Sequence, residues 1–328
     1  MGSILVTGSS GHLGEALMRT LRADGVAAVG LDLAPGAFTD VVGSVADRAL
    51  VREALDGASG VLHTATLHKP QVATRTREEF VRANVTGTLV LAEEAAAAGV
   101  EAFVFTSSTS AFGRALHPAA GEPAAWITED VVDRPRNVYG VTKTAAEDLC
   151  ELVHRDAGLP VVVLRTSRFF PEGDDLLDRR SEFDDLNLKV VELLHRRVDL
   201  ADAVDAHRLA LERAPALGFD RLVVSATTPL RREDAAELHA DAPAVVSRRA
   251  PGWEDVFAAR GWRMPGAIDR VYDNARARER LGWAPRHDFA SALDALRRGE
   301  DPRSELARVI GAKGYAGSSE LYAPDAAA

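Results

Sequence analysis

The sequence predicts an α/β protein, a doubly wound parallel sheet followed by a smaller C-terminal lobe. Three observations predict it. Short apolar runs alternate with stretches of helical periodicity. A glycine-rich turn joins the first apolar run to the first helical stretch. The 328 residues suffice for one large α/β unit with an attached lobe. Because strands that alternate with helices are joined by right-handed crossovers, the sheet is expected to be parallel.

The elements follow from these patterns in chain order. Apolar runs predict strands at 4–6, 29–33, 61–64, 102–106, 161–165 and 222–225. Helical spacing predicts helices at 13–21, 45–55 (with Asp47 as a cap), 78–98, 138–156, 187–195, 200–213, 232–238, 275–281 and 289–298. Residues 114–135 contain prolines at 118, 123 and 135 and read as a long irregular loop, which is usually functional or disordered. Residues 169–185 read as an acidic loop, in which Glu172 is expected to be solvated.

Glycines at positions 8, 11 and 14 follow the first strand. We expect Gly8 to make the tight turn, Gly11 to let the backbone approach a phosphate, and Gly14 to let the helix pack on the strand. A helix that starts here presents free N–H groups and a positive dipole end, which suits a pyrophosphate. The alternative is an ordinary glycine-rich turn, because the spacing differs from the G-x-G-x-x-G fingerprint.

An acidic residue, Asp32, ends the second apolar run 18 residues after Gly14. Its carboxylate can accept hydrogen bonds from both adenosine ribose hydroxyls and would repel a 2′-phosphate, which favours NAD over NADP. The alternative is a solvated aspartate at a strand end. The predicted NAD contacts in this part of the chain are Gly8, Ser10, Gly11, His12, Leu13, Gly14 and Asp32.

The pair Tyr139 and Lys143 is the second chemical signal. Residues four apart share a helix face, and an ammonium beside a phenol would lower the phenol pKa from about 10 towards neutrality. Such a tyrosine is a general base. On its own the Y-x-x-x-K pattern is weak, because chance matches are common.

Taken together with a Ser/Thr-rich strand end at 106–110, these motifs resemble the extended short-chain dehydrogenase/reductase superfamily, in particular its NAD-dependent epimerase/dehydratase family, over roughly residues 3–300. The resemblance implies a Rossmann-type domain at 1–167, a mainly substrate-binding lobe at 168–298 from which some segments return to the large domain, and an extension at 299–328 without an interpretation.

The resemblance also implies roles for individual residues. Ser108 corresponds to the group that hydrogen-bonds the reacting hydroxyl, Tyr139 to the base, and Lys143 to its partner, which also holds the nicotinamide ribose. Asn84 corresponds to a framework residue of the cofactor site, and Ala65 to a small residue beside the cofactor phosphates.

Substrate contacts are expected from Ser108, Thr109, Arg168, Arg263 and His68. Arg168 replaces the family's asparagine beside the substrate diphosphate, which either strengthens an anion contact or marks a different substrate. Arg263 resembles the arginine that grips the diphosphate of a nucleotide sugar, with a solvated surface arginine as the alternative.

Two positions indicate the reaction type. Where nucleotide-sugar 4,6-dehydratases of the family carry an Asp-Glu pair, this chain has Thr109 and Ser110. Elimination of water then lacks its acid and base, and oxidation and reduction remain. The resulting hypothesis is a nucleotide-sugar 4-epimerase. The alternatives are an NAD-dependent dehydrogenase or ketoreductase that releases NADH, and a non-catalytic NAD-binding protein.

Composition excludes other classes of function. A net charge of −10 argues against nucleic acid or an anionic membrane surface as the main partner. The single cysteine, Cys150, excludes an intramolecular disulfide and a Cys-rich metal site, and no metal is expected. No apolar stretch is long enough to span a membrane and no leader is evident, so a cytoplasmic protein is expected. The resemblance implies a homodimer through the helices at 78–98 and 138–156.

Overall fold

The computed structural model describes residues 2–119, 121–173 and 181–314. Its centre is a seven-stranded sheet in the order β3-β2-β1-β4-β5-β7-β8, and every neighbouring pair is parallel. The strands are β1 (Ser3–Thr7), β2 (Ala28–Asp32), β3 (Val41–Val42), β4 (Ala58–His63), β5 (Ala102–Ser108), β7 (Val161–Thr166) and β8 (Phe219–Val224). The order reverses between β1 and β4, which is where open α/β sheets bind ligands. The predicted doubly wound sheet is confirmed.

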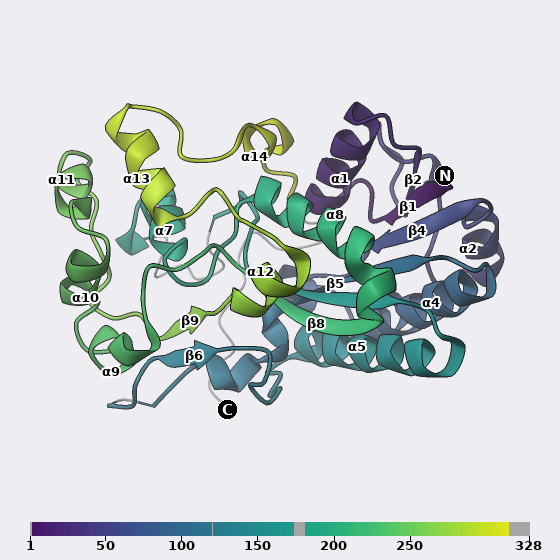
Figure 1. Ribbon diagram of the computed structural model, residues 1–328, viewed down its shortest axis with the longest axis horizontal. Helices are drawn as coiled ribbons and strands as arrows, with labels where there is room; N and C mark the ends of the chain where they lie inside the picture. The colour runs from purple at the N-terminus through teal and green to yellow at the C-terminus, as the bar shows by residue number, and fades with distance from the viewer. Residues whose placement is uncertain (1, 120, 174–180, 315–328) are drawn as a thin grey trace.

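Helices cover both faces of this sheet. One face carries α1 (His12–Ala23), α8 (Leu200–Leu217), α12 (Ala275–Leu281) and α14 (Glu305–Ile310), and the other carries α2 (Arg48–Ala54), α4 (Gly87–Ala97) and α5 (Val138–Ala157). In Figure 1, α1 and α8 lie above the sheet and α4 and α5 below it. Alternate residues of β1 point to opposite faces: Ile4 and Val6 join one core, and Leu5 joins the other. Cys150 is a buried residue of the second core, as predicted.

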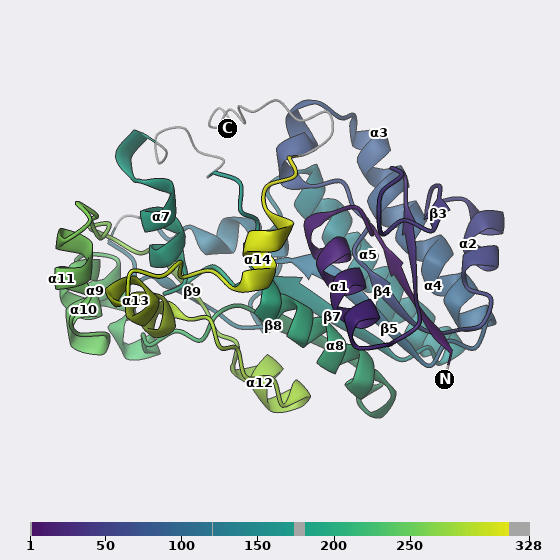
Figure 2. The same ribbon diagram turned by 90° about the horizontal axis from the view of Figure 1, so that it is seen from above.

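A smaller lobe lies beyond the sheet, on the left of Figures 1 and 2. It is built from α7 (Asp185–Glu192), α9 (Ala235–Leu238), α10 (Ala242–Arg249), α11 (Trp253–Ala258) and α13 (Phe289–Arg297) around a third hydrophobic core. A two-stranded parallel sheet of β6 (Ala125–Ile127) and β9 (Arg270–Tyr272) lies beside it. The lobe therefore has its own core, and the cavity described below lies between that core and the large sheet.

Several elements differ from the sequence-based expectation. The helix expected at 78–98 is divided into α3 (Arg77–Phe80), a π-helical segment η2 (Val81–Thr86) and α4. The region 114–135 is not wholly irregular, because it contains the 3₁₀ turn η4 (Gly113–Leu116) and β6. Further short 3₁₀ turns are η1 (Lys69–Ala73), η3 (Thr109–Ala111) and η5 (Arg232–Asp234). The cap expected at the start of α2 is present, since the Asp47 carboxylate accepts from the N–H groups of Ala49 and Leu50.

The segment after residue 299, which had no interpretation, returns to the large domain. Helix α14 contacts α1 and α8, and Ile310 belongs to the same core as α1. The N–H of Ser304 donates to the Asp199 carboxylate at 3.1 Å. Figure 2 shows α14 beside α1. Within the described ranges, none of the helices combines the length and the apolar character that crossing a membrane requires.

Candidate active site

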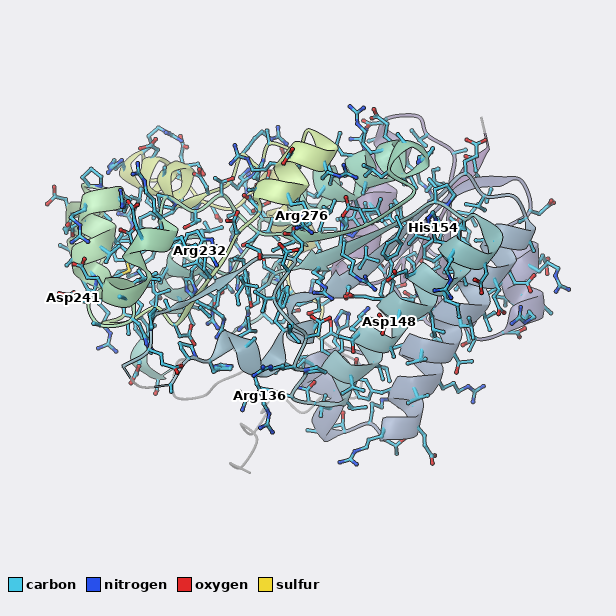
Figure 3. The ribbon with its side chains drawn as sticks, turned by 60° about the horizontal axis from the view of Figure 1, so that its bottom comes forward. Arg136, Asp148, His154, Arg232, Asp241 and Arg276 are labelled. Atoms are coloured by element: carbon cyan, nitrogen blue, oxygen red, sulfur yellow. The ribbon has the colours of Figure 1, made fainter. Side chains whose placement is uncertain are left out.

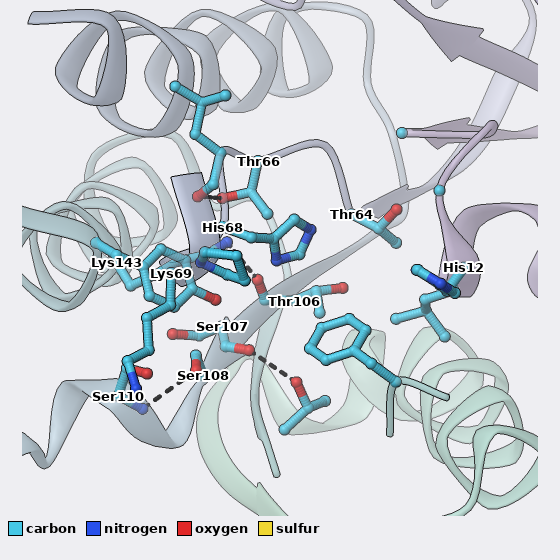
Figure 4. A pocket seen from close by; sticks show the side chains of 18 of the residues that line it. His12, Thr64, Thr66, His68, Lys69, Thr106, Ser107, Ser108, Ser110 and Lys143 are labelled. Carbon is cyan, nitrogen blue, oxygen red and sulfur yellow. Dashed lines mark hydrogen bonds between the residues drawn. The ribbon is translucent and has the colours of Figure 1, made fainter. Parts of the chain in front are cut away.

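A cavity of about 690 Å³ lies at the carboxyl ends of the central strands. It is lined by residues that follow β1, β2, β4, β5 and β7, together with residues of β9 and the segment after α14. Figure 4 shows the close view, in which His12 of α1, Thr64 and His68 of the segment after β4, Ser108 of β5 and Lys143 of α5 surround the cavity. The volume is within the range of small-molecule and cofactor sites. Ten of the residues predicted to contact NAD line it: Gly8, Ser10, Gly11, His12, Leu13, Gly14, Asp32, Ala65, Tyr139 and Lys143.

The glycine turn forms a close backbone cradle. Gly8 has φ +72°, and a Cβ there would lie 2.7 Å from the backbone nitrogen of Ala65. A Cβ on Gly14 would lie 1.9 Å from the carbonyl oxygen of Gly8. Gly11 is the N-cap of α1 and supplies no side-chain hydrogen bond, so the first N–H groups of the helix are available to a ligand. The residues present therefore fit the pyrophosphate of a dinucleotide.

Asp32 ends β2 beside this turn. Its carboxylate accepts from the N–H of Ser10 at 2.9 Å and from the N–H of Ala34 at 2.9 Å. Each bond uses a different oxygen, which leaves lone pairs for the ribose hydroxyls. Asp32 thus ties the second strand to the glycine turn and faces the cavity as expected for an NAD site.

Ser108, Tyr139 and Lys143 meet at the far end of the same cavity. Asn137 caps α5 by accepting from the N–H of Gly140, so that Tyr139 and Lys143 lie in the first turns of the helix. Ser108 ends β5 and hydrogen-bonds Tyr139. Tyr139 is 6% exposed and Lys143 is 2% exposed. The three residues are therefore held by a strand end and a helix start, with little access to water.

The expected lowering of the tyrosine pKa does not arise from the polypeptide alone. Burial raises the pKa of Tyr139 to about 12, and the hydrogen bond with Ser108 acts in the opposite direction. Burial also lowers the pKa of Lys143 to about 7, although Glu147 acts to raise it. The Lys143 ammonium donates to the carbonyl oxygen of Thr106 at 2.8 Å, and its Nζ lies 4.7 Å from the centre of the Phe105 ring. In the polypeptide without cofactor the pKa of Tyr139 is therefore raised, whereas the sequence pattern predicts a lowered pKa.

A network of buried charged residues lies beneath helix α5. Glu147, one turn after Lys143, is 1% exposed, accepts from the Ser107 hydroxyl at 2.5 Å and pairs with Arg165 at 2.6 Å. Arg165 also pairs with Asp133 at 2.6 Å. The Glu147 carboxylate of α5 contacts Ser107 of β5 and Arg165 of β7. The network therefore holds these two strands against α5 beneath the cavity. The charge of Glu147 also acts on Lys143, whose pKa it raises against the effect of burial.

Replacing Glu147 with glutamine is expected to lower the free energy of unfolding by about 3 kcal/mol, because it leaves Arg165 without its main buried partner. The pH above which activity falls should also move lower, since Glu147 acts to raise the pKa of Lys143. Urea unfolding and a kcat–pH profile check both effects. The control is Asp148→Asn, the next carboxylate along α5, which is 79% exposed and visible on the helix in Figure 3. Equal stability of the two variants would contradict the assignment.

Asn84 does not line the cavity. It is 1% exposed on the π-helical segment η2, where its side chain accepts from the N–H of Leu67 at 2.8 Å and donates to the Thr142 hydroxyl at 3.0 Å. It therefore connects the loop after β4 to helix α5, as a framework residue of the cofactor site would, and it is not among the residues that line the cavity. A π-helical turn at such a position is common near functional sites.

His68 and Thr109 line the cavity as expected. The His68 ring centre lies 6.2 Å from that of Tyr139, and burial, followed by the charge of Lys143, lowers the pKa of His68 to about 3. His68 is therefore neutral at physiological pH. Thr109 and Ser110 both line the cavity directly after Ser108, so hydroxyl groups face the position that carboxylates hold in the dehydratases.

The cavity wall opposite helix α5 is basic. Arg168, Arg196 and Arg270 line the cavity. Glu192, 1% exposed, pairs with Arg196 at 2.6 Å and approaches Arg168 at 3.9 Å. Burial raises the pKa of Glu192, but Arg196 and the neighbouring arginines hold it well below its usual range. The arginines outnumber this carboxylate, so the wall carries a positive excess suited to an anionic substrate.

Two arginine assignments change. Arg263 does not line the cavity: its backbone N–H donates to Asn187, its guanidinium donates to the carbonyl oxygen of Glu182, and it lies 4.7 Å from the Phe183 ring. Arg270, to which the sequence assigned no role, lines the cavity, whereas Arg263 does not. Its Nε is buried, and no hydrogen bond to it is found within the described ranges. Arg196 was not selected from the sequence either, and neither arginine stands in a motif that marks it, since β9 has three residues that are all buried.

Glu172 is also placed differently from the expectation of a solvated loop residue. It accepts from His12 at 2.7 Å and from the N–H of Lys313 at 2.9 Å. Asp174 and Asp175 of the same loop lie outside the described residues. Groups of acidic residues, histidines or cysteines with metal-site geometry are not found in the described ranges.

A doubly wound parallel sheet with a Ser-Tyr-Lys set between the end of β5 and the start of α5 defines an enzyme of the extended short-chain dehydrogenase/reductase class. The sequence profile of the NAD dependent epimerase/dehydratase family matches residues 4–216, and the chain belongs to this family. Its cofactor is NAD, which several structural neighbours contain.

Relatives within the family have different activities. A dTDP-glucose 4,6-dehydratase of Streptomyces antibioticus is 31% identical over 274 residues, covering 78% of this chain and 74% of the relative. A UDP-glucose 4-epimerase of Rhizobium meliloti is 26% identical, covering 89% and 95%. The structure of MoeE5 in complex with UDP-glucose and NAD has a TM-score of 0.60 and 26% identity, covering 91% and 99%. Two further matches cover less than half of the relative. An uncharacterized protein of Sinorhizobium fredii is 34% identical, and the match covers 39% of its length. A UDP-glucose 4-epimerase of Erwinia amylovora is 30% identical, and the match covers 45% of this chain and 47% of the relative.

Proposed function

We propose that the protein is an NAD-dependent epimerase that acts on a nucleotide sugar through a transient 4-keto intermediate. The observation that carries this proposal is an intact Ser108, Tyr139 and Lys143 set beside hydroxyl residues, Thr109 and Ser110, where elimination needs carboxylates. The site has the groups for removing and returning a hydride and a proton. It lacks the acid–base pair for loss of water.

Each of the three residues then has a defined role. Tyr139 removes the proton of the sugar 4-hydroxyl, and Ser108 donates a hydrogen bond to the oxygen that becomes a carbonyl. Lys143 holds positive charge near the phenol and orients the nicotinamide ribose. Bound NAD supplies the hydride acceptor and a cationic ring, and that charge opposes the raised pKa of Tyr139. The keto sugar turns over before hydride and proton return to the opposite face, so the reaction has no net oxidation.

The basic wall supports binding of the anionic diphosphate part of the substrate. A diphosphate brings two negative charges and several acceptor oxygens, and guanidinium groups such as Arg168, Arg196 and Arg270 bind them well. Arg270 has a buried Nε that an oxygen of the substrate would satisfy. On this proposal the nucleotide lies against the small lobe, and the sugar reaches across the cavity to Tyr139.

The test uses purified protein and a panel of UDP- and dTDP-sugars, followed by ¹H NMR and absorbance at 340 nm. We expect a nucleotide sugar to convert to its 4-epimer without added NAD and without a rise at 340 nm. A 4-keto-6-deoxy product would show a dehydratase instead. A panel without any reaction would remove the support for a nucleotide-sugar substrate.

The second candidate is a dehydrogenase that releases NADH. Arg168 in place of the family's asparagine and Arg263 outside the cavity favour it, because they remove two features of a nucleotide-sugar site. The basic wall would then bind a phosphorylated or carboxylated secondary alcohol. This candidate predicts NADH at one equivalent per product, which the same absorbance measurement detects.

The proposal includes a homodimer formed by α4 and α5. Val141 and Leu152 are exposed on α5, at 50% and 36%, and Val81 is exposed at 47% just before α4. Family resemblance supports pairing of these helices. Light scattering of the purified protein should give twice the 35.1 kDa chain mass, and a charge placed by Val141→Glu should shift it to one chain mass.

A further inference from the structure

The last described segment of the chain reaches the glycine turn. The N–H groups of Lys313 and Gly314 donate to the Glu172 carboxylate at 2.9 and 3.0 Å. Glu172 in turn pairs with His12, the first residue of α1, at 2.7 Å. Three segments that are distant in the sequence therefore meet at one carboxylate beside the N-terminus of α1.

The Lys313 ammonium lies directly on the glycine turn. Its Nζ donates to the carbonyl oxygen of Ser10 at 2.8 Å and pairs with Glu15 in the first turn of α1. Lys313 and Gly314 line the same cavity as Gly11 and His12. Because the glycine turn is the pyrophosphate cradle, this cation lies where the two phosphate charges of NAD arrive.

Three other cations that line the cavity are engaged away from this turn. Lys143 donates to the Thr106 carbonyl, Arg196 pairs with Glu192, and Arg270 pairs with Asp269 at 2.8 Å. Lys313 is held at the turn by its backbone, since its N–H and that of Gly314 are fixed on Glu172. It is 23% exposed, so water screens the ammonium only in part.

Glu172 is suited to hold this segment because it stays charged. Burial raises the pKa of Glu172. The hydrogen bond from His12, the charge of His12 and the hydrogen bond from the Lys313 N–H outweigh this effect and lower the pKa to about 2. The carboxylate is 20% exposed. Helix α14 supports the contact from the other side, since Ile310 is anchored in the core shared with α1. The segment thus has a fixed base at residue 310 and a fixed contact at 313.

We infer that Lys313 is an NAD-binding residue, positioned by Glu172 and His12 over the cofactor pyrophosphate. Its ammonium, which Glu15 also holds at the turn, adds a charged hydrogen-bond donor to the N–H groups of α1, and the segment 311–314 has to move before the pyrophosphate can leave. The residue holds NAD between turnovers. This inference concerns NAD alone and does not depend on which substrate is used.

The test measures exchange of radiolabelled NAD⁺ from the holoenzyme into excess unlabelled NAD⁺, without sugar. Lys313→Gln and Glu172→Gln should each release NAD at least about tenfold faster, as expected for loss of a charged contact. Lys313→Arg should restore slow release. The matched control is Arg308→Gln, which removes an exposed cation from α14 and should leave release unchanged.

A second measurement separates a phosphate contact from a general loosening. The affinity of Lys313→Gln for ADP-ribose, which contains the pyrophosphate, should fall about tenfold, whereas its affinity for adenosine should stay the same. Release within twofold of the wild type in both glutamine variants would overturn the inference, and so would equal losses for ADP-ribose and adenosine. If Lys313→Gln does not fold, Glu172→Gln decides the question. A failed sugar screen would leave these results unaffected.

Discussion

Tyr139→Phe is expected to lower the turnover of a nucleotide sugar by about a thousandfold, in the range of a lost general base. The phenol is the group that takes the proton from the sugar hydroxyl, and it is 6% exposed beside Lys143, which is 2% exposed. NAD should remain bound, since the glycine turn and Asp32 are unchanged. Steady-state kinetics and the NAD content of the purified variant measure the two effects.

The matched control for this variant is Thr144→Val on the same helix. It also removes one hydroxyl group, but that group donates to the Val141 carbonyl at 2.9 Å and lies outside the cavity lining. Its turnover should stay close to that of the wild type. Turnover above about a tenth of the wild-type value in Tyr139→Phe would rule out the phenol as the base.

Gly14→Ala is expected to weaken NAD binding by about a hundredfold, the equivalent of losing one or two charge-assisted hydrogen bonds. The added Cβ would lie 1.9 Å from the Gly8 carbonyl oxygen, 2.6 Å from its carbon and 2.9 Å from the Ser9 Cα, all backbone atoms. The turn has to open to make room, and the N–H groups of α1 then leave the phosphate positions. Overpacking of this kind also costs about 1–3 kcal/mol of stability.

Gly266→Ala serves as the control for this change, because a Cβ there meets no atom within 4 Å. Calorimetric titration with NAD and thermal unfolding of both variants measure the effects. Unchanged NAD affinity in Gly14→Ala would show that the cradle is not tightly packed. Equal losses in both variants would point to a general effect of removing glycine.

Much of the large domain could be predicted because its signals are local. Central strands such as β1 and β5 are continuous apolar runs, as expected for strands buried on both faces. The cap Asp47 and the glycine turn mark the starts of helices. The small lobe was harder, because α10 and α11 have eight and six residues and its strands have three each. Short elements stabilised by tertiary contacts leave little periodicity to detect.

The candidate site shows the same difference between local sequence signals and long-range contacts. Tyr139, Lys143 and the glycines lie in contiguous motifs, and the structure brings them into one cavity. Arg270 and Lys313 reach that cavity only through the pairing of β9 with β6 and the packing of α14 on α1. The direction of a pKa shift was equally inaccessible, since burial is a property of the folded chain. Long-range contacts decide these features.

The most direct test of the proposed reaction uses UDP-glucose deuterated at C4, incubated with the purified protein and no added NAD. The product should be the 4-epimer with deuterium still at C4, because the hydride is held in the site and returned to the other face of the same sugar. Mass spectrometry and NMR report both the epimer and the label. Epimer that has lost its deuterium, or deuterium recovered in released NADH, would contradict the mechanism.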